Sequence, residues 1–552
     1  MTCYYDFIII GAGAAGCVIA HNLVKAGFHV ALVEAGGDYD SNYYVQIPQL
    51  FGNLWNPITY PPDYKTCSYD PPWDSWNILT YAGCTGSQPY CYPRASGRGG
   101  STSHHAMVTL RGSDSVYEYW EQVTGDADWG PINMNLTFDQ IQKDWLQITG
   151  TEPEKAELDF MQNVIQNHNI PFTAETSKGE PGIGFWTFSI DAKTGERCNS
   201  STHLLSRVQD NPLLKTFLHC FVTKIIICPK TKKAVGIEYI DAPYQYKADT
   251  LNQCAPENVP TKIIKARLEV ILCGGSINSP QLLLLSGVGS CKDLTELDIE
   301  CIYDNEHVGR NLLDHPELWV NYKLDDCPRH RWQAFWPFEL DSPVHTEFKK
   351  YGIGPCRYPF SATGLTHKND DGCCWHIGIY TIPSDNFCVE NWFYDYDYAN
   401  TTYLSFLIEN VCPNSFGYLK LQSKDPTVPP FINEQLDTDE NADCIAAGVR
   451  FLDECIRTME RCSYKPIRVY PPIDTDIREF FKCNSAYGHH MGGTCSMMSV
   501  VDPNGCVYGI KRLRVADLSI VPSLPNVNPS YVVYAIGEII SRKIIRKYCK
   551  ML

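Results

Sequence analysis

The sequence lacks several features that would place it in common classes of protein. Its 25 cysteines include no pair spaced C-x-x-C, which removes the usual zinc-knuckle and thioredoxin-like sites. It has no apolar run long enough to predict a membrane-spanning helix. A formal net charge of -17 disfavours nucleic-acid binding, because the average surface repels phosphate. No internal repeat is visible.

The N-terminus also lacks the pattern of a signal peptide, since Cys3-Tyr4-Tyr5-Asp6 leads directly into an apolar segment. Because 25 is an odd number, at least one cysteine must be unpaired or joined to another chain. Scattered thiols and several disulfides both stay open. A chain of 552 residues has room for two to four domains at about 150 residues each.

The first 34 residues contain the pattern of a dinucleotide site. Phe7 to Ile10 is typical of a strand buried on both faces, a helix is expected over Ala14 to Ala26, and a second buried strand over Val30 to Val33. The motif G-x-G-x-x-G, at Gly11-Ala12-Gly13-Ala14-Ala15-Gly16, lies between the first strand and the helix, and Glu34 follows the second strand.

Each glycine of this motif has a physical task. Gly11 permits the tight turn, Gly13 lets a pyrophosphate approach the backbone, and Gly16 lets the helix pack on the sheet. The helix N-terminus binds phosphate through its free N–H groups, and Glu34 accepts hydrogen bonds from the adenosine ribose. The motif predicts dinucleotide binding but does not distinguish FAD from NAD.

The rest of the chain divides into two kinds of sequence. Strand-like segments return at 217–228, 234–239 and 267–273, whereas 319–483 is aromatic and punctuated by proline, with strand-like segments at 403–408 and 418–421. We predict a second domain there, an antiparallel sheet with helices. Residues 38–95 show no lasting periodicity and predict a long irregular excursion, which is usually functional.

Several further blocks of sequence resemble the signatures of the glucose-methanol-choline (GMC) oxidoreductase family, which includes aryl-alcohol, glucose and choline oxidases. The resemblance spans residues 6 to 540 and weakens between 319 and 483. The blocks that carry it are Pro93 to Met107, Arg111-Gly112-Ser113, Gly275 to Gly289, Val308 to Pro316, Tyr487 to Met498 and Leu513 to Pro522.

The resemblance implies the α/β fold class, with α+β character for the chain taken as a whole. It implies a Rossmann-like FAD-binding domain with a parallel sheet, over 1–150, 195–318 and 484–552, and a substrate domain with a mainly antiparallel sheet, over 151–194 and 319–483. FAD is the implied cofactor. The implied cofactor-binding residues are Gly11, Gly13, Ala14, Ala15, Gly16, Glu34, Arg94, Gly99, Gly100, Ser101, His104, His105, Ala106, Met107, Val222, Asp517, Asn528 and Pro529.

The resemblance also places His490 on the catalytic histidine of the family, with His489 as its neighbour and Met491 in place of the usual proline. Asn528 falls where family members carry a second histidine or an asparagine. A histidine is suited to accept the hydroxyl proton of an alcohol, and an asparagine to donate a hydrogen bond to the developing alkoxide.

The implied reaction is hydride transfer from an alcohol carbon to flavin N5, which yields an aldehyde or lactone. Oxygen or another acceptor then takes the electrons, and oxygen would yield hydrogen peroxide. A lyase on the same fold, which needs FAD without net redox chemistry, is an alternative. No metal site, nucleic-acid partner or membrane span is predicted, and a homodimer or larger assembly stays open.

The sequence also leaves open how the flavin is attached, what role the chain has and which substrate it takes. A covalent bond from His104 to the flavin and a noncovalent pair of histidines both fit. The cysteine-rich composition is similar to that of GMC-type proteins in giant-virus particles, where the fold serves as a building block. A trimmed, secreted or virion-associated chain is therefore favoured over a cytoplasmic one. Trp332, Trp336, Trp375 and Trp392 either line a substrate pocket or belong to the core.

Overall fold

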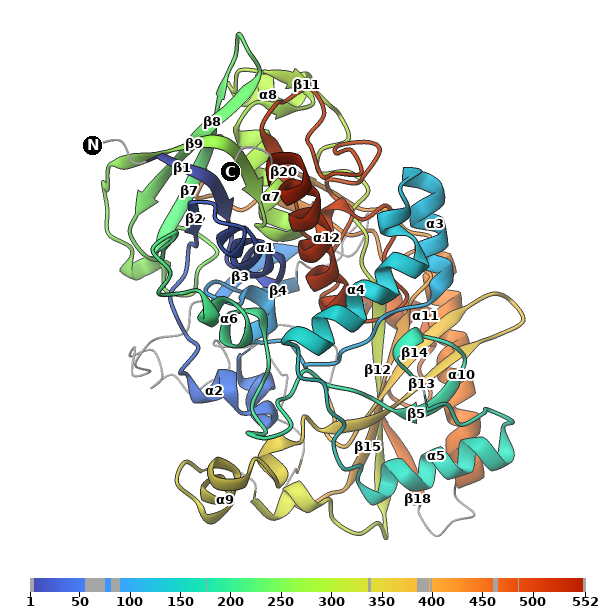
Figure 1. Cartoon of the computed structure of the whole chain (residues 1–552). Coiled ribbons are helices and arrows are strands. Elements are labelled where there is room, and N and C mark those ends of the chain that lie inside the picture. The colour runs from blue at the N-terminus through green and yellow to red at the C-terminus, as the bar shows by residue number, and fades with distance from the viewer. Residues whose placement is uncertain are drawn as a thin grey trace.

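The computed structural model describes residues 4–54, 75–80, 90–174, 176–335, 339–384, 397, 400–459, 465–484 and 486–549. Two large sheets organise these residues, one in the upper half of Figure 1 and one in the lower half. Each sheet takes strands from distant parts of the sequence. The chain therefore passes between the two halves more than once.

The first sheet has seven strands and is centred on β1 and β9. Five of its strands run parallel, as expected for a Rossmann-like domain, whereas β7 and β8 are antiparallel to their neighbours. The predicted parallel sheet is confirmed for these five strands, and β7 and β8 depart from it because a short turn joins them as a hairpin. The strand order is β6 (Leu214–Phe217), β2 (Val30–Val33), β1 (Tyr4–Ile10), β9 (Thr261–Leu272), β8 (Lys233–Asp241) and β7 (Cys220–Cys228), and β20 (Leu513–Val515) also pairs with β9.

The predicted strands at the N-terminus are confirmed. β2 has the predicted bounds, and β1 begins three residues earlier than predicted, at Tyr4. The segment 217–228, predicted as one strand, is divided between β6 and β7. His219 lies in the break with a φ of 53°, a left-handed conformation through which a strand cannot continue.

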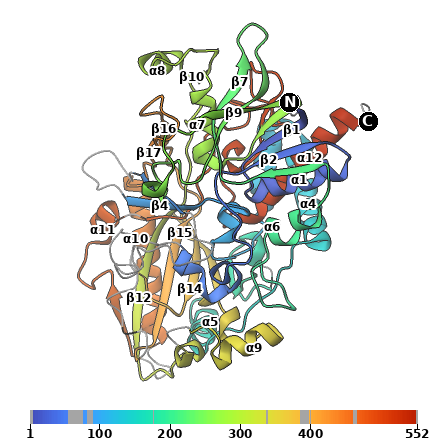
Figure 2. The same ribbon diagram turned by 90° about the vertical axis from the view of Figure 1, so that its left-hand side faces the viewer.

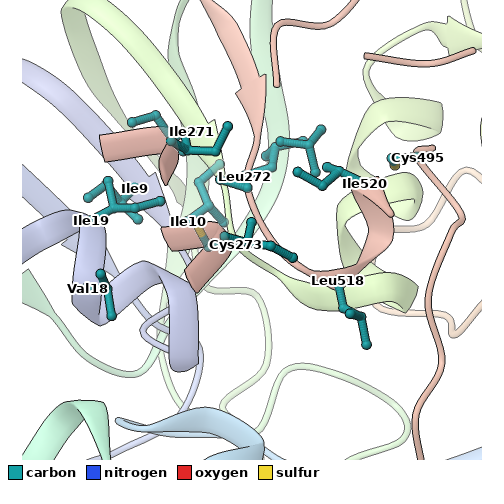
Figure 3. Close-up of a cluster of buried hydrophobic side chains, with 14 of the residues drawn as sticks. Ile9, Ile10, Val18, Ile19, Ile271, Leu272, Cys273, Cys495, Leu518 and Ile520 are labelled. Atoms are coloured by element: carbon teal, nitrogen blue, oxygen red, sulfur yellow. The ribbon is translucent and has the colours of Figure 1, made fainter. Parts of the chain in front are cut away.

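The core of this half lies beneath the glycine-rich turn. α1 (Ala14–Lys25) packs against β1 and against α12 (Ser530–Tyr548), and Ile9, Val18 and Ile19 are fully buried between them. Figure 3 shows these side chains together with Ile271 and Leu272 of β9. The close packing of β1, α1 and α12 therefore holds the glycine-rich turn in place.

The second sheet is antiparallel throughout, which confirms the prediction for 319–483. Its order is β18 (Lys465–Tyr470), β12 (Pro316–Asp325), β15 (Tyr403–Asn410), β14 (Cys374–Tyr380), β13 (Ser361–Lys368) and β5 (Gly182–Phe185), and β19 (Ala486–Tyr487) also pairs with β12. α10 (Asp439–Met459) covers the sheet, because Ile445, Val449, Leu452 and Ile456 form one buried helical face. Figure 2 shows α10 beside β12 and β15.

The remaining helices and small sheets surround these two layers. None of the described helices has both the length and the apolar character needed to cross a membrane. A disulfide joins Cys291 to Cys301. The domain boundaries stay a prediction. The helices and short strands outside the two large sheets are α2 (Tyr43–Gln46), β3 (Ser75–Thr80), β4 (Tyr90–Ala95), α3 (Asp114–Thr124), α4 (Pro131–Asp144), α5 (Lys155–Asn167), α6 (Ser200–His203), α7 (Gly275–Leu285), β10 (Val288–Gly289), α8 (Cys291–Glu296), β11 (Tyr303–Asp304), α9 (Pro343–Tyr351), β16 (Tyr418–Lys420), β17 (Phe431–Asn433) and α11 (Ile477–Asn484).

Candidate active site

A cavity of about 340 Å³ extends from the glycine-rich turn of the first sheet to the face of the second sheet. Residues Gly11, Gly13 and Glu34 line one end, and His490 and Asn528 line the other. The cavity thus connects the predicted dinucleotide site with the predicted catalytic pair.

The turn after β1 is shaped for close approach of a phosphate. Gly11 has a φ of +99°, and a Cβ atom on it would overlap the backbone of Cys273. Gly13 is the N-cap of α1 and provides no side-chain cap, so the first N–H groups of the helix stay available. A Cβ atom on Gly100 would lie 2.7 Å from Cα of Gly13, so only glycine lets the two turns meet.

Glu34 lies where β2 ends and its carboxylate is held by the backbone. It accepts hydrogen bonds from the N–H groups of Ala12, at 2.7 Å, and Gly36, at 3.0 Å. Burial raises the pKa of Glu34, while these N–H groups act in the opposite direction. Each oxygen keeps a second lone pair with which it can accept a hydrogen bond from a ribose hydroxyl.

Most of the predicted cofactor-binding residues line this cavity. Gly16 and Gly99 do not: Gly16 packs against the backbone of Gly11, and Gly99 faces the side chain of Ser103. Both therefore shape the turns instead of facing the cavity. The residues that line it are Gly11, Gly13, Ala14, Ala15, Glu34, Arg94, Gly100, Ser101, His104, His105, Ala106, Met107, Val222, Asp517, Asn528 and Pro529.

Arg94 and Asp517 meet at the N-terminus of α7. Asp517 accepts hydrogen bonds from the backbone N–H of Gly275, at 2.9 Å, and from the hydroxyl of Ser279, at 2.6 Å. Arg94 donates to the side chain of Asn278 at 3.0 Å. Burial lowers the pKa of Arg94, and nearby groups that include Asp517 partly offset the effect. A carboxylate and a guanidinium therefore line the middle of the cavity.

Three further histidines are buried beside the cavity. Burial lowers the pKa of His104 well below its usual value and that of His489 to about 3. Burial and the guanidinium of Arg197 lower the pKa of His105 to about 3. All three are therefore neutral at physiological pH. His489 packs against the rings of Tyr92 and Tyr487.

His490 and Asn528 form the pair that the sequence predicted. Nδ2 of Asn528 lies 3.1 Å from Nε2 of His490. On the other side of the ring, Nδ1 of His490 lies 2.8 Å from Oε1 of Glu409. Asn528 directly precedes α12, and His490 follows β19, so elements from two parts of the C-terminal segment bring the pair together.

Glu409, at the end of β15, is surrounded by imidazole rings. Oε2 lies 3.1 Å from Nδ1 of His376, and Oε1 lies 3.4 Å from Nδ1 of His315. Burial alone would raise the pKa of Glu409, but His490, His315 and His376 together hold it well below the usual value. Glu409 is thus a buried carboxylate that stays ionised.

The backbone of His490 is held by Asp314, which lies just before β12. Oδ1 of Asp314 accepts from the backbone N–H groups of His490, at 2.9 Å, and His315, at 2.8 Å. Oδ2 accepts from the hydroxyl of Tyr92 at 3.1 Å. Burial raises the pKa of Asp314 to about 6, and His490 opposes that shift.

The sequence had not predicted roles for Tyr92, Asp314, His315, His376 and Glu409. Asp314 and His315 lie in one of the blocks that resemble the GMC family, so that resemblance was the available signal. Glu409 gave a weaker signal, because it is an acidic residue directly after the apolar segment 403–408 that was predicted as a strand. Tyr92 directly precedes the block Pro93 to Met107 and His376 follows the pocket candidate Trp375, but no motif included either residue itself.

The same cluster brings together donor atoms of the type that bind metal ions. Single ligand atoms of His315, Glu409 and His490 lie within 4.8 Å of one another. The sequence had predicted no metal site, and that stays a prediction.

Apolar and aromatic side chains form the cavity wall near His490. They are Phe51, Trp319, Phe360, Tyr380, Ile382 and Leu407. Trp332 and Trp375, two of the predicted candidates, are buried in the core and do not line the cavity. Trp336 and Trp392 lie outside the described residues.

Comparison with known proteins points to the same family as the fold and the sequence blocks that resemble GMC signatures. Models of the N-terminal and C-terminal parts of GMC oxidoreductases match residues 5–317 and 413–537. The chain belongs to the GMC oxidoreductase family. FAD is the cofactor of this family, and the glycine-rich turn, the start of α1 and Glu34 fit its dinucleotide.

This GMC oxidoreductase is similar to characterised members over almost its full length. It is 27% identical to an alcohol dehydrogenase (acceptor) of Pseudomonas putida, covering 98% of this chain and 96% of that protein. It is 26% identical to an oxygen-dependent choline dehydrogenase of Pectobacterium atrosepticum, covering 98% and 95%. A solved structure of a formate oxidase variant from Aspergillus oryzae has a TM-score of 0.82 at 20% identity, covering 100% of both chains.

Proposed function

We propose that this GMC oxidoreductase is an FAD-dependent alcohol oxidase or dehydrogenase in which His490 is the general base. One observation carries this proposal: His490 lines the cavity with Nε2 beside Asn528, while Nδ1 lies 2.8 Å from the ionised Glu409. One nitrogen faces the cavity, where substrate would replace its contact with Asn528, and the other lies beside a carboxylate.

These contacts define which nitrogen can accept a proton. The amide of Asn528 donates to Nε2, so Nε2 carries the lone pair and Nδ1 carries the hydrogen, with Oε1 of Glu409 at 2.8 Å and Nδ1 of His315 at 3.0 Å. When Nε2 takes the hydroxyl proton of an alcohol, the ring becomes positively charged. The carboxylate of Glu409 stabilises that charge in a site with little water.

Asn528 has a second task once substrate is present. Its amide can donate to the oxygen of the alcohol as that oxygen loses its proton, and it does not compete with His490 for the proton. When bound, FAD supplies the acceptor for the hydride and passes the electrons to oxygen or another acceptor, with hydrogen peroxide formed from oxygen. Removal of the hydroxyl proton by His490 makes the C–H bond easier to break.

The wall of the cavity supports apolar or aryl primary alcohols as substrates. Trp319, Phe360, Tyr380 and Leu407 offer few groups that could hydrogen-bond to the several hydroxyls of a sugar. Each hydroxyl buried there without a partner costs about 1–3 kcal/mol. We propose that an aryl or aliphatic alcohol is oxidised faster than a sugar.

The base is tested by stopped-flow reduction of the bound flavin with the best alcohol from a panel, without oxygen. We expect His490→Ala to slow reduction by about 10²–10⁴-fold while the flavin bound per chain is unchanged. His489→Ala is the matched control, because the neighbouring ring of His489 packs on Tyr92 and Tyr487. Near-normal reduction in His490→Ala would show that the base is misassigned.

The reaction class is tested by the same anaerobic experiment on the unchanged protein. An alcohol oxidase or dehydrogenase bleaches its flavin when substrate is added, whereas a lyase converts substrate without lasting bleaching. The panel should contain aryl, aliphatic and sugar alcohols. Faster bleaching by sugars than by aryl alcohols would contradict the proposed substrate class.

A further inference from the structure

Four cysteines meet at one end of the second sheet, beside α10. Cys373 and Cys374 lie where β14 begins, Cys412 follows the end of β15, and Cys444 lies on α10. The backbone N–H of Val411 donates to the carbonyl of Cys374 at 3.1 Å, so Cys412 is at the same edge of the sheet as Cys374. We call these four residues the thiol cluster.

The thiol cluster consists of two separate pairs. The thiols of Cys374 and Cys412 lie close enough for each to shift the pKa of the other, and Cys373 lies close enough to Cys444 to raise its pKa. The indole N–H of Trp375, on the same face as Cys373, donates to the carbonyl of Cys444 at 3.1 Å.

We propose that the thiol cluster is an oxidation site in which Cys374 forms a disulfide with Cys412 and Cys373 forms one with Cys444, with hydrogen peroxide as the oxidant. Disulfide bonding explains this arrangement better than a shared metal ion. A zinc site made of four cysteines gathers its sulfurs around one point, whereas among the described residues no three of these sulfurs lie within 4.8 Å of one another.

The first pair has one reactive thiol and one that can complete the bond. The hydrogen bond from Cys412 and the charge of Lys368 lower the pKa of Cys374 to about 7, against the effect of burial. The same hydrogen bond raises the pKa of Cys412, which therefore keeps its proton. Cys374 is partly exposed and Cys412 is exposed, so dissolved peroxide can reach them.

The proposed step balances in atoms and electrons. The Cys374 thiolate attacks one oxygen of hydrogen peroxide, the O–O bond breaks, and hydroxide leaves as Cys374 becomes a sulfenic acid. The sulfur of Cys412 then attacks the sulfur of Cys374, the S–O bond breaks, and the oxygen leaves as water with the proton of Cys412. Two thiols and one peroxide give one disulfide and two water molecules.

A disulfide between Cys374 and Cys412 would connect β14 and β15, the strands that carry His376 and Glu409 of the candidate active site. Cys374 is two residues from His376, and Cys412 is three residues from Glu409. Nδ1 of His376 lies 3.1 Å from Oε2 of Glu409. The peroxide could come from turnover, in which case the source rests on the proposed function. Peroxide added from outside tests the cluster without any turnover.

The test begins with reduced, FAD-loaded protein from which the reductant has been removed. One to four equivalents of hydrogen peroxide are added, free thiols are alkylated, and peptides are mapped by mass spectrometry. We expect peptides linked through Cys374–Cys412 and Cys373–Cys444, a loss of four free thiols, and a rise in Tm of several degrees because the unfolded chain is constrained.

Matched variants separate this result from general oxidation. Cys374→Ser and Cys412→Ser should each lose the first linked peptide and part of the rise in Tm. Cys254→Ser, which removes an exposed thiol elsewhere, should behave as the unchanged protein. Four thiols that stay alkylatable after four equivalents of peroxide would overturn the proposal, and so would one zinc ion per chain that protects them until a chelator is added.

Discussion

Glu317 and Glu409 lie directly opposite each other on the antiparallel strands β12 and β15, and both are buried. The three histidines around Glu409 hold its pKa well below the usual value. Burial, together with the charges of Glu409 and Asp314, raises the pKa of Glu317 well above the usual value. Burial and these neighbouring charges therefore favour the protonated form of Glu317, which lies beside the carboxylate of Glu409.

The first prediction compares two isosteric changes at these facing positions. Glu409→Gln removes the charge that stabilises the protonated His490, so we expect flavin reduction to slow by about 10²-fold. Glu317→Gln keeps a hydrogen-bond donor, so we expect a change of less than about threefold. Equal losses in both variants would contradict this division of tasks.

The second prediction concerns stability and pH. Glu317 has a raised pKa in the folded protein, so its contribution to stability is complete below the pKa of the unfolded chain, about 4.3, and is lost as pH rises toward the folded pKa. Glu317→Gln removes this loss. The Tm of the variant relative to the unchanged protein should therefore be higher at pH 8 than at pH 5, and the reverse order would refute the assignment.

The third prediction concerns the space around Gly488. A Cβ atom there would lie 2.7 Å from Nδ1 of His490, 3.0 Å from Oε1 of Glu409 and 3.1 Å from Oε1 of Glu317. Gly488→Ala should separate His490 from Glu409 and reduce kcat by at least about tenfold with FAD still bound. Gly150→Ala is the control, since its nearest atom would be 3.7 Å away.

The fourth prediction concerns the approach of the two glycine turns. Gly100→Ala would place a methyl group 2.7 Å from Cα of Gly13, so we expect the purified protein to contain much less FAD. Gly125→Ala is matched for backbone strain, because Gly125 also has a positive φ, +65°, but has open space around its Cβ position. The absorbance of bound flavin per chain measures both; equal FAD content would refute the role of Gly100.

The fifth prediction concerns the link between His104 and the flavin. We expect acid precipitation to leave the flavin in solution and the pellet colourless, which corresponds to noncovalent binding. A yellow pellet that becomes colourless in His104→Ala would instead show covalent attachment at this histidine. His105→Ala is the control, because its ring contacts Arg197 at 2.9 Å.

The dinucleotide site could be predicted because it is local. Its strand, turn, helix and acidic residue all lie within the first 34 residues, and at Gly11 and Gly16 a Cβ atom would overlap backbone of or beside that segment. The pairing of His490 with Asn528 was predicted through the family resemblance. The break at His219 was not, because the apolar residues on both sides continue the pattern of one strand.

The sequence by itself determined the GMC architecture and predicted the FAD site and the two residues that we propose for catalysis. Only the tertiary structure showed that Asp314 holds His490 from 176 positions away and that Glu409, His315 and His376 surround the same ring. Spacing in a sequence does not encode such distances. Nor does it encode protonation: Glu317 and Glu409 are the same residue type, and packing alone gives them opposite pKa shifts.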